Sequence, residues 1–162
     1  MRQNQSKVPA LFAAIICAFS INVQADDGKI ISSAICQAMT PNGAEHLRHL
    51  GSSLQAVGAD VTVICPIVRD SMGGRMKWVD VRHRRPSGAG GEQVSGRVYS
   101  CDATYGGCYN TAQSYTDTSN TFTSVFLDTG SLPFNSDHYF YYRSVLPENW
   151  KIVAIEYLEG NH

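Results

Sequence analysis

Short runs of apolar and β-branched residues recur along the chain, and in most of them apolar and polar side chains alternate. A period of two is the pattern of a β-strand that buries one face. Gly, Pro, Asn, Asp and Ser separate the runs, as turns require. The pattern predicts strands at Lys29–Cys36, Ser53–Val57, Asp60–Ile67, Met76–His83, Val94–Cys101, Tyr109–Tyr115, Thr121–Leu127, Tyr139–Leu146 and Lys151–Leu158.

The run around Trp78 shows this alternation clearly. Val79 and Val81 fall on one side of the strand, and Trp78, Asp80 and Arg82 fall on the other. A sheet of such strands must bury its apolar side against another layer. Because no series of long helices is present to form that layer, we expect an all-β fold, an antiparallel two-sheet β-sandwich of the jelly-roll or Ig-like kind. A short helix at Ala44–Leu50 is the only one expected.

Composition sets the class of protein. The chain has 162 residues, of which 43% are hydrophobic and 17% charged, a balance that suits one globular domain. The formal net charge is −1, so the chain has no basic field of the kind that binds nucleic acid without sequence preference. We expect a single domain over residues 26–162 and no nucleic-acid partner.

The first 25 residues have the pattern of a secretory signal peptide. Arg2 and Lys7 precede an apolar run from Val8 to Ile21, and a small residue, Ala25, ends the segment. The run is shorter than the roughly 20 residues that span a bilayer. Lipidation at Cys17 is disfavoured because isoleucine, not a small residue, precedes it. We expect cleavage after Ala25, a mature net charge of −3 after the loss of the two cations, no membrane span, and a secreted or periplasmic location.

Four cysteines remain after this cleavage: Cys36, Cys65, Cys101 and Cys108. In an oxidising compartment an even number predicts disulfides, here two bridges with three possible pairings. The turn-rich segment between Cys101 and Cys108 can bring two short strands together. We therefore predict that these two pair locally and that Cys36 pairs with Cys65. A zinc site is the alternative, but Cys36 and Cys65 lack the close spacing of paired zinc ligands.

Several segments together resemble one protein family. They are Cys36-Gln37, the run Val61–Arg69 with its Cys-Pro-Ile-Val-Arg sequence, Tyr99-Ser100-Cys101, Leu146-Pro147 and Glu156-Tyr157. In these the chain is similar to a family of small exported bacterial proteins that consist of one β-sandwich domain and have no established function. Members often carry a cysteine where Ser144 stands, and Cys108 is an addition here, which favours the local bridge. The resemblance implies a fold but no catalytic residues.

Two features suggest hydrolytic chemistry. Asp128-Thr129-Gly130 follows apolar strand residues, as the aspartate of an aspartic protease does, but that reaction needs a second aspartate sharing one proton. We interpret the segment as a turn at the end of a strand. Glu148, Glu156 and Glu159 are candidate glycosidase carboxylates, yet no spacing singles out a pair. No Gly-x-Ser-x-Gly motif is present. We expect no enzymatic activity, with a small cell-envelope hydrolase as the alternative.

A metal site is suggested by two histidines. His46 and His49 are three residues apart and would share one face of the helix predicted at Ala44–Leu50, where Glu45 or Asp60 could add a ligand. Nothing in the sequence brings those carboxylates to the pair. Exposed histidines on a short polar helix are the simpler interpretation, so we expect no metal site and no cofactor.

One local basic run is a candidate binding site. Arg82, Arg84 and Arg85 lie near Trp78, and guanidinium groups beside an aromatic ring can bind phosphate or carboxylate groups. The alternative is a solvated strand end whose charges discourage edge-to-edge pairing.

An aromatic strand provides a second candidate. Tyr139 and Tyr141 share one face with Arg143, and if Phe140 and Tyr142 are buried the two tyrosines can stack on sugar rings or on a protein. The alternative is that both faces pack in the core. Together with the basic run, this strand predicts an exported, non-catalytic binding or surface-interaction module. Its expected partner is an anionic glycan of the cell envelope or of a host, or another exported protein.

Overall fold

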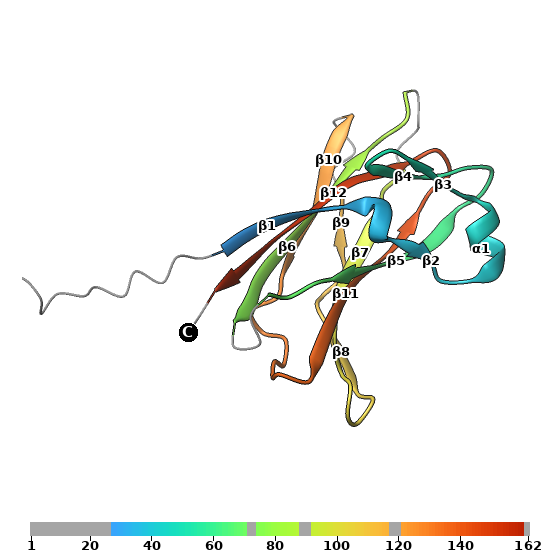
Figure 1. Ribbon diagram of the computed structural model, residues 1–162. Coiled ribbons are helices and arrows are strands. Elements are labelled where there is room, and N and C mark those ends of the chain that lie inside the picture. Colours follow the sequence, from blue (N-terminus) through green and yellow to red (C-terminus); the bar gives the residue numbers. More distant parts are fainter. Residues whose placement is uncertain (1–26, 71–73, 88–91, 117–120, 161–162) are drawn as a thin grey trace, which may run out of the picture.

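The computed structural model describes residues 27–70, 74–87, 92–116 and 121–160 (Figure 1). Within these ranges the chain forms two antiparallel six-stranded sheets that pack on a common core, which confirms the predicted sandwich. The predicted signal peptide, residues 1–25, lies outside the described residues. In the part of the chain that is described, no helix is long and apolar enough to cross a membrane.

The first sheet, sheet A, contains β1 (Asp27–Ser32), β3 (Leu47–Leu50), β4 (Ser53–Ala56), β6 (Arg75–Arg84), β10 (Phe122–Asp128) and β12 (Lys151–Gly160). Its central strand is β12, which pairs with β6 on one side. On the other side β12 pairs with β4 near its start and with β1 along the rest of its length. The outer strands are β10 beside β6 and β3 beside β4.

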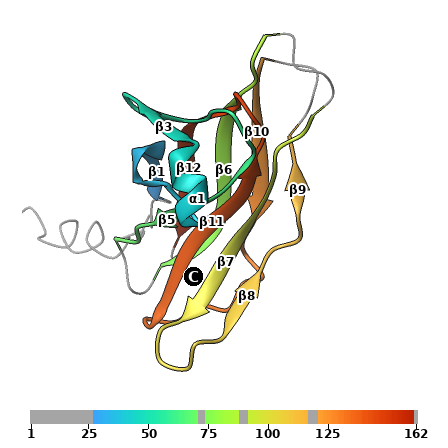
Figure 2. The same cartoon turned by 90° about the vertical axis from the view of Figure 1, so that its right-hand side faces the viewer.

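The second sheet, sheet B, contains β2 (Gln37–Ala38), β5 (Val61–Ile67), β7 (Ser95–Asp102), β8 (Cys108–Asn110), β9 (Ser114–Tyr115) and β11 (His138–Leu146). Its central strand is β11, which lies between β5 and β7. The short strand β2 covers part of the free edge of β5. On the other flank, β8 and β9 pair with opposite ends of β7 (Figure 2).

Strand alternation directs one side of each sheet into the core. Val79 and Val81 of β6 are fully buried, while Trp78, Asp80 and Arg82 lie on the solvent side, as the alternation predicts. Alternate residues of β5, β7 and β11 fill the other half of the core. Each large apolar side chain buried in this way contributes about 1.5–3 kcal/mol. Because the side chains of a strand alternate, burial of these apolar residues turns their neighbours outward to solvent.

The two disulfides confirm the predicted pairing. Cys36–Cys65 spans 29 residues, lies in the core, and ties the residue before β2 to β5. Cys101–Cys108 spans 7 residues and joins paired positions of β7 and β8. By the chain-entropy description, closing loops of these lengths stabilises the fold by about 3 to 4 kcal/mol and about 2 kcal/mol, respectively.

The helix predicted at Ala44–Leu50 is wrong in position. The helix α1 spans Pro41–Glu45. Thr40 caps it by accepting a hydrogen bond from the Gly43 N–H at 3.1 Å, and proline occupies the first turn, where its missing N–H costs nothing. The residues that follow form β3, which turns back onto β4 through Gly51 at a φ of 63°. The end of the expected helix is therefore a strand.

Two predicted strands are interrupted. The strand predicted at Lys29–Cys36 ends at Ser32. The Ser32 hydroxyl accepts a hydrogen bond from Ala34 N and caps a 3-10 turn over Ser33–Ile35. The run predicted at Tyr109–Tyr115 divides into β8 and β9 because Thr111 turns inward between them. Its hydroxyl accepts a hydrogen bond from Val98 N at 3.1 Å, and its own N–H donates to the Val98 carbonyl. The Thr111 hydroxyl thus replaces a backbone carbonyl as the acceptor for the Val98 N–H of β7.

A fully buried histidine should make the fold sensitive to acid. Burial lowers the pKa of His83 from 6.5 to about 4. Between these values the unfolded chain binds a proton at this position and the folded chain does not, so stability falls as pH decreases through this window. The free energy of unfolding should drop by about 3 kcal/mol between pH 6.5 and pH 4 through this group.

Urea unfolding at several pH values checks this expectation. His83→Leu should flatten the pH dependence in this window, and the same replacement of the exposed His49 of β3 serves as the control. Equal slopes for the wild type and His83→Leu would show that the buried imidazole is not the acid-sensitive group.

Candidate functional site

The predicted binding residues lie on opposite faces of the sandwich. Trp78, Arg82 and Arg84 point outward from β6 in sheet A, whereas Tyr139 and Tyr141 point outward from β11 in sheet B. The core lies between the two groups. A single ligand surface therefore cannot contain both, and each face has to be considered separately.

The basic run on sheet A is partly neutralised by its neighbours. Arg82 forms an ion pair with Glu156 on the adjacent strand. Arg84 lies over the Phe122 ring at 5.4 Å. Trp78 is six residues from Arg84, about 20 Å along an extended strand, so ring and guanidinium do not form one site. At the end of this sheet a cavity of about 430 Å³ is lined by Gln55, Arg84, Arg85, Pro86, Ser87, Asn149 and Lys151.

Three tyrosines form the aromatic part of the sheet B face. Tyr141 and Tyr99 are cross-strand partners on β11 and β7, and their rings stack at 4.9 Å with an angle of 4°. This separation is close to the roughly 4.8 Å between paired strands. Tyr139 continues the row along β11, 6.3 Å from Tyr141 and tilted by 24°. The rings of Tyr139 and Tyr141 thus lie in line along one strand.

A groove, here called the tyrosine groove, runs beside these rings. Its volume is about 440 Å³, and it is lined by Gln37, Met39, Ile64, Pro66, Ile67, Tyr139, Phe140, Tyr141 and Arg143. In the described part of the chain, the segment 37–39 covers the edge of β5 from Thr62 to Ile64, so the groove lies beyond the start of β2. Beyond that point Pro66 lies at a free strand edge, where its lack of an N–H donor has no cost.

The Tyr141 phenol keeps its proton at neutral pH. Partial burial is the largest cause that raises its pKa, and the neighbouring Tyr99 and Tyr139 add to it, while the Arg143 cation opposes the rise. The hydroxyl group is therefore both a hydrogen-bond donor and an acceptor for a ligand in the groove.

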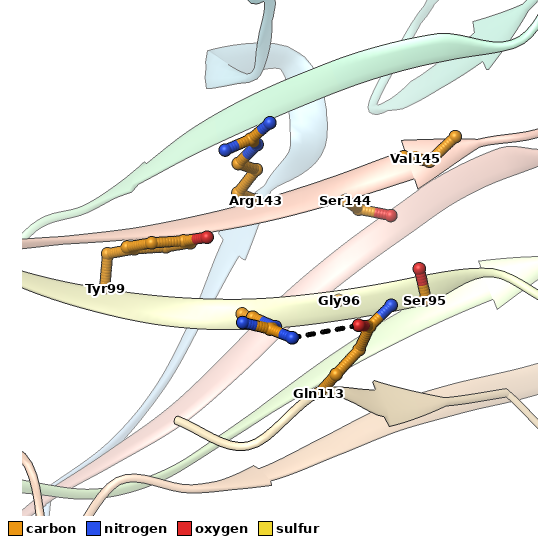
Figure 3. A pocket seen from close by; sticks show the side chains of 8 residues that line it. Ser95, Gly96, Tyr99, Gln113, Arg143, Ser144 and Val145 are labelled. Atoms are coloured by element: carbon orange, nitrogen blue, oxygen red, sulfur yellow. Dashed lines mark hydrogen bonds between the residues drawn. The ribbon is translucent and has the colours of Figure 1, made fainter. Parts of the chain in front are cut away.

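A second pocket, the arginine pocket, lies on the other side of β11 (Figure 3). It has a volume of about 220 Å³ and is lined by Ser95, Gly96, Arg97, Tyr99, Gln113, Arg143, Ser144 and Val145. Arg143 belongs to both the tyrosine groove and the arginine pocket. The two cavities therefore form one continuous surface on sheet B, with Arg143 at their junction.

The floor of the arginine pocket is held by a close contact in the core. Tyr142 of β11 is fully buried, and its ring lies against the backbone of Gly96 on β7. A methyl group at position 96 would come within 2.3 Å of the Tyr142 ring and hydroxyl. Only glycine at position 96 leaves room for this ring beneath the pocket.

Two other motifs of the sequence have structural roles. Asp128 accepts a hydrogen bond from the Gly130 N–H at 2.9 Å, which is the turn expected after β10. His46 follows α1, and its Nδ1 lies 3.0 Å from the Val57 carbonyl oxygen, whereas His49 lies on β3. Within the described ranges, no group of three or more His, Cys, Asp or Glu side chains is placed to hold a metal ion.

The structure also brings together a serine, a histidine and an aspartate, which the sequence analysis missed. Ser100 Oγ lies 2.7 Å from His138 Nδ1, and His138 Nε2 lies 3.7 Å from Asp102 Oδ2. Ser100 is fully buried, and its hydroxyl donates to the Pro133 carbonyl at 2.6 Å. A nucleophile must be open to substrate. The three side chains instead tie β7, the start of β11 and the preceding loop together.

The Asp102 carboxylate stabilises a turn through hydrogen bonds to backbone N–H groups. Its Oδ1 accepts hydrogen bonds from Thr104 N at 2.7 Å and Tyr105 N at 3.0 Å, and these two bonds are the main cause of its lowered pKa. The carboxylate therefore orders the loop of the β7–β8 hairpin.

The chain matches no protein-family model and no curated protein sequence. The family resemblance of the Cys-Pro-Ile-Val-Arg segment stays a prediction, and function has to be argued from the two surfaces themselves.

The contact between Gly96 and Tyr142 can be tested by substitution. Gly96→Ala should lower stability by about 1–3 kcal/mol, because the added methyl group overpacks the core. Gly107→Ala is the control, since a Cβ at position 107 meets nothing within 4 Å. Chemical denaturation of both variants measures the effect, and equal stability of the two would show that Tyr142 does not depend on glycine at position 96.

Proposed function

We propose that the mature protein is a non-catalytic binding module that acts outside the cytoplasm and recognises a carbohydrate on the outer face of sheet B. The observation that carries this proposal is the tyrosine groove, in which Tyr139 and Tyr141 line up along β11 with Arg143 at the end. Aromatic rings bind the apolar faces of sugar rings, and polar groups beside them bind the hydroxyl groups.

The dimensions of the groove favour a carbohydrate over a protein surface. A volume of about 440 Å³ falls in the range of small-molecule sites, whereas a stable protein interface buries roughly 800 Å² on each partner. The apolar lining of Ile64 and Pro66 is bordered by Gln37, Arg143 and the phenol hydroxyls. This mixture suits a ligand whose units each have one apolar face and a polar rim.

Export is supported by the cysteines. Both disulfides join elements of the fold, and such bonds persist in oxidising compartments such as the periplasm or the extracellular space. The signal peptide predicted over residues 1–25 is consistent with this location.

Substitution of the groove tyrosines tests the site. Tyr141→Ala should weaken binding to an oligosaccharide ligand found on a glycan array by about 3- to 10-fold, the equivalent of about 0.5–1.5 kcal/mol for one aromatic contact. Tyr139→Ala should act in the same direction. Calorimetric titration of purified mature protein gives the affinities.

Two controls make this test specific. Tyr105→Ala removes an exposed tyrosine from the β7–β8 loop, and the double variant Arg84→Ala with Arg85→Ala removes cations from the end of sheet A. Both should bind as the wild type does. Loss of binding in the double variant, with Tyr141→Ala unaffected, would place the ligand on sheet A and contradict the proposal.

The hydrolase alternative rests on Ser100, His138 and Asp102. A fluorophosphonate probe reacts with activated serines that are open to solvent. We expect no labelling of the folded protein, because Ser100 is buried and its proton is engaged by Pro133. Labelling that disappears in Ser100→Ala would favour the hydrolase over the binding module.

A further inference from the structure

We propose that the arginine pocket is an anion subsite and that the carbohydrate bound on sheet B is acidic, with a carboxylate or sulfate group seated between Arg97 and Arg143. This inference rests on the proposed function and names the substrate class of the same surface. These two arginines belong to sheet B and are distinct from Arg82, Arg84 and Arg85 of the basic run.

The two arginines are opposed across neighbouring strands. Arg143 on β11 and Arg97 on β7 are direct cross-strand partners, and both side chains lie on the solvent face of sheet B. Like charges at such positions are destabilising. On the opposite face of the sandwich, Arg82 of sheet A forms an ion pair with Glu156, whereas no aspartate or glutamate is among the described residues that line either cavity of sheet B.

Neutral side chains hold the Arg97 guanidinium in place. Its Nη1 donates to Asn110 Oδ1 at 3.3 Å, and its Nη2 donates to Gln113 Oε1 at 3.1 Å, the bond drawn in Figure 3. Amide oxygens fix the position of the cation without cancelling its charge. Such preorganisation lowers the entropic cost of binding an anion.

Arg143 completes the site from the other strand. Among the described residues it forms no hydrogen bond or ion pair, and its side chain is exposed at the junction of the two cavities. A planar guanidinium can bind a carboxylate or sulfate through two parallel N–H donors. Both arginines line the same pocket, so an anion seated there can accept hydrogen bonds from each guanidinium.

The position of the pocket relative to the tyrosines suits an acidic polymer. Tyr141 and Arg143 are two residues apart on one strand, about 7 Å along its axis. A sugar ring beside Tyr141 can therefore place a charged substituent, its own or that of the next unit, at Arg143. With a volume of about 220 Å³ the pocket admits a single such group with bound water.

A matched pair of ligands tests the charge requirement. The probes are an oligogalacturonate and its fully methyl-esterified form, which share one backbone and differ in charge. Wild-type mature protein should bind the acidic form at least tenfold more tightly, and this preference should shrink as salt is added. Arg143→Gln should reduce the preference, taken as the ratio of the affinities of the same variant for the two glycans, to less than twofold. Arg84→Gln, an exposed arginine of sheet A, is the matched control and should keep the wild-type preference.

A second measurement does not depend on glycan binding. Sodium sulfate titration, followed by the NMR signals of the arginine side-chain Nε–H groups, should give saturable shifts at Arg97 and Arg143 that disappear in Arg143→Gln. Because Arg143 forms no hydrogen bond or ion pair among the described residues, the melting temperature of this variant at low salt should equal or exceed that of the wild type. A clearly lower melting temperature would show that Arg143 is a structural residue.

The outcomes separate the two proposals. Binding of both glycans with equal affinity would refute the anion subsite and leave the carbohydrate module intact. Saturable sulfate shifts without glycan binding would support the subsite and refute the carbohydrate proposal, with an acidic protein segment as the remaining occupant. Uniform, non-saturable shifts in all arginines would overturn the subsite. If sulfate saturates the pocket but only a sulfated oligosaccharide binds, the charged group is a sulfate ester rather than a carboxylate.

Discussion

The packing of the Tyr142 ring against Gly96 constrains the pairing of β7 with β11 from inside the core. A side chain at position 96 would occupy the space of the ring, so the two strands can pair as they do only with glycine there. In this register Tyr141 stacks on Tyr99 on the opposite side of the sheet. Packing inside the core and the order of side chains on the surface are therefore linked through one strand pair.

The two faces of the sandwich differ in how their charges are balanced. On sheet A, Arg82 is paired with Glu156 and Arg84 lies over Phe122, so these cations already have partners. On sheet B, the hydrogen bonds of Arg97 to described residues go to amide oxygens, and its partner on the neighbouring strand is Arg143. Like charges at paired positions of neighbouring strands are in general unfavourable. The proposed anion subsite would give this pair of cations a counter-charge beside the row of aromatic rings.

Alternation along single strands was enough to predict much of this arrangement. It predicted that Val79 and Val81 share one side of their strand and that Tyr139 and Tyr141 share one face of theirs, and the fold buries the former and turns the latter outward. The pairing of Arg97 with Arg143 could not be predicted in this way, because strand register across a long connection depends on contacts made only in the fold. The approach of His138 to Ser100 has the same origin. The helix was misplaced because Thr40 and Pro41 start it earlier than the apolar spacing suggested.

By this account, ligands should bind the outer face of sheet B and not that of sheet A. Amide chemical-shift mapping of the isotopically labelled mature protein with an acidic oligosaccharide tests this directly, because every strand reports at once. The largest shifts should lie in β5, β7 and β11 around Pro66, Arg97, Tyr141 and Arg143. Shifts concentrated in β6 and β10, or at the end of sheet A near Arg84 and Lys151, would contradict the account.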